Sequence, residues 1–125
     1  MDEPIPDDLR EFILAYIDSV AHLEALLLLR QDPSMDWNPK SMAERLYITK
    51  GEASDLLTRL TDNGFVVVIE GFYQFGPRSA EQRQMVDRVA DAYSRHLIPI
   101  TNLIHDRPRR IREFSDAFKI RKDRS

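Results

Sequence analysis

The sequence predicts a mainly α-helical domain with one small β-hairpin and a long C-terminal helical extension. Apolar residues recur at helical spacing over 7–32 and again over 80–104. Between these stretches, residues 39–62 carry two helix-start signals. Residues 65–75 form a β-branched and aromatic run that Glu70-Gly71 divides. A chain of 125 residues is long enough to bury a core within one domain of ordinary size.

The first helical pattern begins after Pro6, where Asp8 and Glu11 have the spacing of a capping box. No Gly or Pro interrupts residues 7–32, but Asp18-Ser19 is a possible second start. One long bent helix and two shorter helices are both allowed. We divide the chain into an N-terminal helix (1–19), a central domain (20–78), a long helix (79–106) and a basic tail (107–125).

Two short helices are predicted in the central domain. Asn38-Pro39 is typical of an N-cap and first helical position, which predicts a helix over 39–46. Thr49 and Glu52 form a capping box, which predicts a helix over 50–62. Asn63-Gly64 ends this helix, with Gly64 in the left-handed conformation. The hairpin then follows over 65–75.

The last strong pattern predicts one long helix over 80–105. Ser79 caps it, and its apolar stripe continues for about seven turns. The stripe consists of Val86, Val89, Ala90, Tyr93, Leu97, Ile100 and Ile104. Pro99 lies inside the pattern and is expected to kink the helix. Because the apolar stripe is longer than one short helix could cover, we expect the protein to form a homodimer through this helix. The alternative is that the stripe packs only on the protein's own first helix.

The central order of short helix, tight turn, capped helix and hairpin is that of a winged helix-turn-helix. Residues 42–66 resemble the winged-helix regulators of bacteria, particularly the MarR-like group, and the resemblance covers roughly residues 20–76. The positions that match the family's structural pattern are Ala43, Leu46, Ile48, Ala53, Leu57, Leu60 and Gly64.

The resemblance implies a cytoplasmic transcriptional regulator that binds double-stranded DNA, with helix 50–62 in the major groove. The positions that would meet DNA are Asn38, Lys40, Thr49, Lys50, Ser54, Thr58 and Arg59. Lys50 and Arg59 would contact phosphate or base edges, and Asn38 and Lys40 would position phosphate.

The charge pattern departs from that of the family. Glu52 and Asp55 are acidic, and residues 34–77 carry a net charge of −2. A duplex-binding surface usually carries several uncompensated positive charges. The hairpin tip also has no Lys or Arg, but it has Phe72 and Tyr73. The alternative hypothesis is therefore an adaptor that binds a protein partner through its acidic face and the aromatic tip.

The tail carries a net charge of +5 over residues 107–125 and alternates basic with apolar side chains. It could supply auxiliary contacts to nucleic acid or to a partner. Its apolar side chains could also dock on the rest of the protein while the basic side chains stay in solvent. Alternatively, the tail could lie on a membrane surface. The basic residues singled out for such contacts are Arg109, Arg110, Arg112, Arg121 and Lys122.

Nothing in the sequence indicates an enzyme, a cofactor or a metal site. There is no cysteine, and the three histidines have no metal-ligand spacing. We expect His22 to be a packed or half-exposed histidine rather than a ligand. No Gly-rich phosphate loop or Ser-His-Asp set is recognisable. No apolar stretch reaches about 18 residues, and the acidic start is unlike a secretory signal, so we expect no membrane span.

Overall fold

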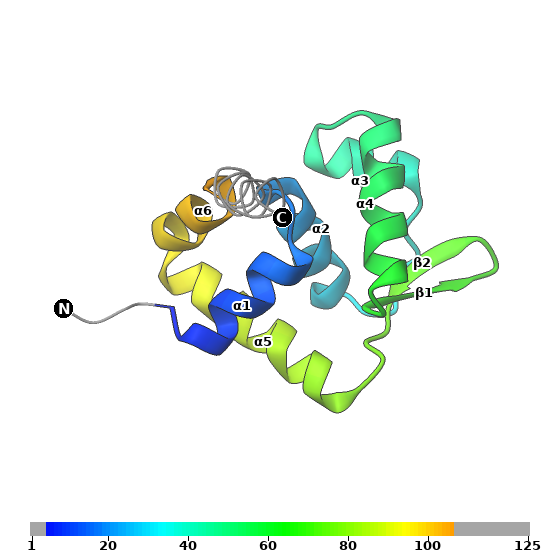
Figure 1. Ribbon diagram of the computed structural model, residues 1–125. Helices are drawn as coiled ribbons and strands as arrows, with labels where there is room; N and C mark the ends of the chain where they lie inside the picture. Colours follow the sequence, from blue (N-terminus) through cyan, green and yellow to red (C-terminus); the bar gives the residue numbers. More distant parts are fainter. Residues whose placement is uncertain (1–4, 107–125) are drawn as a thin grey trace, which may run out of the picture.

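The computed structural model describes residues 5–106, which form a helical domain with one antiparallel hairpin (Figure 1). In chain order the elements are α1 (Asp7–Tyr16), α2 (Val20–Gln31), α3 (Pro39–Leu46), α4 (Lys50–Asp62), β1 (Val66–Ile69), β2 (Phe72–Phe75), α5 (Ala80–Arg95) and α6 (Leu97–His105). The predicted class, mainly α with a small hairpin, is confirmed.

The first helical stretch is two helices rather than one. α1 ends at Tyr16, and the hydroxyl of Ser19 caps α2 by accepting from the His22 amide at 3.1 Å. The two helices meet at an angle of 102°. The predicted Asp8–Glu11 capping box is wrong, because Pro6 is the N-cap residue and no side chain caps α1. Asp8 instead bonds to Arg88 of α5.

The two short helices have the predicted bounds. Asn38 and Ser41 form a reciprocal capping box at the start of α3. Tyr47 makes the turn to α4 in the left-handed conformation, at φ 58°. Gly64 follows α4 at φ 85°, and the Phe65 amide donates to the Leu60 carbonyl, which closes the helix end.

The hairpin has a two-residue turn in which Glu70 and Gly71 both have positive φ, as a type I′ turn requires. Its register pairs Val68 with Tyr73 and Ile69 with Phe72. Trp37 adds a single bridge on the other side of β2, where its amide and carbonyl bond to those of Tyr73.

The prediction of one long helix kinked at Pro99 is wrong. The chain leaves the helical conformation at His96, so α5 and α6 are separate helices. Pro99 lies in the first turn of α6, where backbone amides have no acceptor within the helix. Because proline has no amide hydrogen, it fits this position without losing a helical hydrogen bond. The break also leaves Leu97 and Ile98 50% and 65% exposed, although Leu97 belonged to the predicted stripe.

One buried cluster joins all parts of the domain, with α2 in the middle. α1, α5 and α6 pack together on one side of α2, and α3, α4 and the hairpin lie on the other (Figure 1). The apolar residues of α5 and α6 are inside this cluster, among them Val86, Val89, Ile100 and Ile104. Most of the stripe expected to form a dimer is therefore covered by the chain itself, by α1 as the alternative held but also by α2, and Leu97 is exposed.

Within residues 5–106 no single helix is long and apolar enough to cross a membrane. Only α1 and α2 taken together reach such a length, and they are bent sharply where they meet.

Candidate nucleic-acid interface

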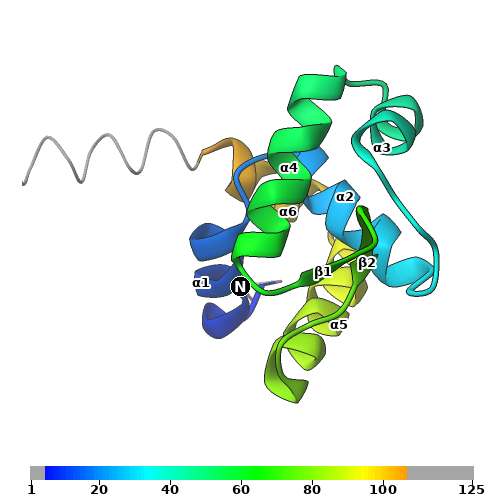
Figure 2. The ribbon, with the colours of Figure 1, turned by 90° about the vertical axis from the view of Figure 1, so that its right-hand side faces the viewer.

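α4 lies on the outside of the molecule, with one face turned to solvent. Figure 2 shows the helix running across the front of the domain, with the hairpin beside its C-terminal end. Ala53, Leu57 and Leu60 anchor its inner face in the core. The outer face is therefore held rigidly by an apolar seam and stays open to a partner.

Three predicted contact residues of α4 follow one line along a flank of that outer face. Lys50, Ser54 and Thr58 are spaced four residues apart, so they lie above one another. Lys50 and Thr58 are exposed, and Ser54 is half-buried. The Thr49 hydroxyl is already engaged, since it accepts from the Glu52 amide at 3.0 Å. Thr49 therefore serves as a cap.

At the start of α3, Asn38 and Lys40 have different environments. The Asn38 side-chain oxygen accepts from the Ser41 amide at 2.8 Å, so this residue fixes the helix end. Lys40 is exposed and enters no salt bridge within the described residues. Lys40 is the residue of this pair that is available to bind an anion.

Arg59 is held by an ion pair that the sequence did not reveal. Its guanidinium contacts the carboxylate of Asp18, in the turn between α1 and α2. The Arg59 side chain nevertheless remains 60% exposed. A phosphate that reached Arg59 would have to compete with Asp18.

The outer face of α4 is not strongly basic. Besides Lys50 and Arg59 it exposes three carboxylates, those of Glu52, Asp55 and Asp62. Glu52 is engaged as a cap, where its carboxylate accepts from the Thr49 amide. The acidic departure noted in the sequence is therefore present on the surface that would meet a partner.

The hairpin exposes an apolar face that the sequence analysis missed. Val67, Ile69 and Phe72 project from one side of the sheet, and all are more than a third exposed. Tyr73, named with Phe72 as a tip residue, is instead half-buried against the core and is bonded through its backbone to Trp37. A bridge to a distant residue leaves no local signal, so the sequence could not separate the two aromatics.

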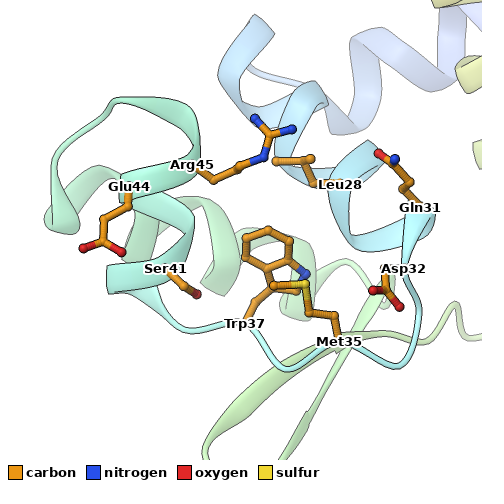
Figure 3. A pocket seen from close by; sticks show the side chains of 8 residues that line it. All are labelled: Leu28, Gln31, Asp32, Met35, Trp37, Ser41, Glu44 and Arg45. Atoms are coloured by element: carbon orange, nitrogen blue, oxygen red, sulfur yellow. The ribbon is translucent and has the colours of Figure 1, made fainter.

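Two hollows flank the outer surface of α2. The larger, of about 640 Å³, is lined by α2, by the 32–37 loop and by α3, and the Trp37 indole forms its wall (Figure 3). Arg45, Asp32 and Glu44 all line this hollow, so it carries charges of both signs and favours neither anionic nor cationic ligands. The second, of about 390 Å³, lies beside Tyr93. Burial, and then the Glu24 carboxylate, raise the pKa of Tyr93.

His22 and the possible metal-ligating groups can be placed within residues 5–106. That part of the chain contains no group of three His, Cys, Asp or Glu side chains that could hold a metal ion. His22 is fully buried, and its Nδ1 accepts from the Asp18 amide at 3.1 Å. It is a packed core histidine, as expected.

The predicted auxiliary residues Arg109, Arg110, Arg112, Arg121 and Lys122 lie outside the described residues. No protein-family model matches the chain, and no curated protein matches it either. The resemblance to MarR-like regulators therefore stays a prediction that rests on the residues quoted above.

Proposed function

We propose that this protein is a winged-helix regulator of bacterial transcription that acts in the cytoplasm and inserts α4 into the major groove of double-stranded DNA. The observation that carries the proposal is the arrangement of α4. It follows α3 after a three-residue turn, turns its capped start and one face to solvent, and has a hairpin beside it. That order and exposure are what a recognition helix needs.

The contacts follow from position and charge. Lys50 at the first turn of α4 and Lys40 at the start of α3 are exposed cations that suit phosphate. Ser54 and Thr58 lie further along the same line, where hydroxyls can bond to base edges. Arg59 joins them when a phosphate displaces Asp18. Asn38 and Thr49 contribute indirectly, because they fix the starts of α3 and α4.

The number of cations sets the strength of binding. With Lys40, Lys50 and Arg59 as the phosphate contacts, the affinity should fall with salt with a logarithmic slope of about −3. Three contacts are few for a specific DNA-binding protein, so the described domain should bind weakly. A much steeper salt dependence would indicate that the basic tail also contacts DNA phosphates.

The test is fluorescence anisotropy of the full chain with duplex DNA over a range of salt concentrations. Lys50→Ala should weaken binding and reduce the salt slope by about one unit. Arg95→Ala is the matched control, because Arg95 is an exposed cation on α5 paired within its own helix. Equal losses in the two variants would reject α4 as the contact helix.

A second function is favoured by the hairpin. Its exposed Val67, Ile69 and Phe72, with no Lys or Arg between Phe65 and Phe75, suit a protein surface better than a phosphate backbone. In this adaptor function, Phe72→Ala should abolish partner binding while DNA binding is absent or unchanged. The same anisotropy series therefore separates the two functions.

A further inference from the structure

The outer edge of β1 has backbone groups directed away from the sheet. Tyr73 uses its amide and carbonyl to bond to Trp37, so they point away from β1. Val68 lies opposite Tyr73, which makes this a non-hydrogen-bonded pair of the antiparallel ladder. The Val68 amide and carbonyl therefore point off the free edge. No strand within residues 5–106 pairs with that edge.

Apart from its length of four residues, this edge has none of the features that usually prevent strands from pairing. Natural edge strands are protected by Lys, Pro, a bulge or a covering segment. Residues 65–75 contain no Lys, Arg or Pro. β1 pairs without a bulge, and Val67, Val68 and Ile69 are 41–50% exposed. An edge of this kind is suited to accepting another strand.

We infer that β1 pairs antiparallel with β1 of a second copy of this chain, around a two-fold axis at Val68, to form a four-stranded sheet. A two-fold axis at Val66 would place the second strand along Gly64 and Phe65, which are buried, so the pairing must centre on Val68, with Val66 at its end. Each Val68 then exchanges both backbone hydrogen bonds with its counterpart. Val67 falls opposite Ile69 of the second copy, so their exposed side chains cover one another.

The charges at the two ends of β1 are complementary in this register. Glu70 falls opposite Val66 of the second copy, two residues from its Gly64. The Arg78 guanidinium lies against Gly64, within 3 Å of where a Cβ would stand. Neither Glu70 nor Arg78 has an ion-pair partner in the described part of the chain. The two-fold axis also keeps the two Glu70 carboxylates at opposite ends.

The size of the contact makes this a weak dimer. A four-residue strand pair buries less than the roughly 1,000 Å² typical of stable interfaces. Sedimentation velocity of the full chain should therefore show a concentration-dependent equilibrium between monomer and dimer. No DNA is added, so the result does not depend on the proposed function of α4.

Charge reversal tests the register. Glu70→Arg alone and Arg78→Glu alone should each raise the dimer dissociation constant at least about tenfold, because each places like charges together at both ends. An equimolar mixture of the two variants should regain wild-type dimerisation, since each Arg then meets a Glu. Glu44→Arg is the control for net charge, because Glu44 is exposed on α3 and far in sequence from β1. Circular dichroism confirms folding of each variant.

Three outcomes would overturn the inference. The first is that the wild type stays monomeric at all concentrations up to about 1 mM, where even a small interface should associate. Alternatively, Glu70→Arg would dimerise like the wild type. Finally, the mixture would dimerise no better than either variant alone, which would place the interface elsewhere.

Discussion

Arg59 couples the outer face of α4 to the turn between α1 and α2 through its ion pair with Asp18. If Arg59 binds phosphate, Asp18→Asn should strengthen DNA binding, because the guanidinium no longer has a competing carboxylate. The free energy of unfolding should change by about 1 kcal/mol or less, since the Arg59 side chain is 60% exposed although that of Asp18 is 27% exposed. Anisotropy with duplex DNA and urea unfolding measure the two effects.

The control for this prediction is Asp87→Asn. It releases Arg30 from a comparable exposed ion pair that joins α2 and α5. That variant should leave DNA affinity unchanged. If Asp18→Asn fails to raise the affinity above that of Asp87→Asn, Arg59 does not contact phosphate.

Two glycines, one in the first turn of α4 and one just after its end, should respond in opposite directions to substitution by alanine. Gly64 has φ 85°, so Gly64→Ala should destabilise the protein by about 1–2 kcal/mol. Gly51 is helical, and a Cβ there would come no closer than 3.9 Å to another residue, so Gly51→Ala should stabilise by about 0.5 kcal/mol. Urea unfolding of both variants checks the signs. A stabilised Gly64→Ala would show that this turn carries no strain.

At the scale of elements, Asp8 and Arg88 tie α1 to α5 through two hydrogen bonds of 2.7 and 3.0 Å. The Arg88 hydrogen bond holds the pKa of Asp8 below its usual value. A lowered pKa in the folded state stabilises the protein above the usual aspartate pKa. That stabilisation disappears as the pH falls through the folded-state pKa.

Asp8→Asn should therefore lower stability at about pH 6, and the difference from the wild type should disappear as the pH falls through the lowered folded-state pKa of Asp8. Urea unfolding across this range measures the gap between the two proteins. Asp91→Asn is the comparison, because Asp91 pairs with Arg95 within α5 and joins no two elements. A gap that stays constant with pH would contradict the pair's role.

Capping residues and glycines predicted where the central helices and the hairpin turn begin and end. Asn38 and Thr49 fixed the starts of α3 and α4, and Gly64 and Gly71 fixed the end of α4 and the turn of the hairpin. The break at His96 lies just before Pro99, which has no amide to donate to the Arg95 carbonyl, so the sequence did mark a disruption here. What the local pattern did not show is that α5 and α6 are separate helices that both pack on α1.

The sequence predicted which positions of α4 are exposed, but not the contacts that their side chains make. The outward line of Lys50, Ser54 and Thr58 follows from helical spacing alone. The ion pair of Arg59 joins residues 41 positions apart, and the bridge from Trp37 to Tyr73 joins residues 36 apart. Contacts at such separations are properties of the folded chain and leave no periodic signal.

At the scale of the whole molecule, the single buried cluster predicts one cooperative unfolding transition. Trp37 is the only tryptophan, and it is buried beside the hairpin, whereas most of the helical signal comes from the other elements. Tryptophan fluorescence and far-ultraviolet circular dichroism should therefore give the same urea midpoint. Separate midpoints would show that residues 20–78 and 79–106 unfold independently.

The central claim is that α4 meets DNA with its outer face. Amide chemical-shift mapping of the isotope-labelled full chain, titrated with duplex DNA, tests it most directly. We predict the largest shifts at Lys50, Ser54 and Thr58 and at the start of α3, with little change along α5. Shifts confined to the hairpin, or no shifts at saturating DNA, would contradict the claim and would favour a protein partner.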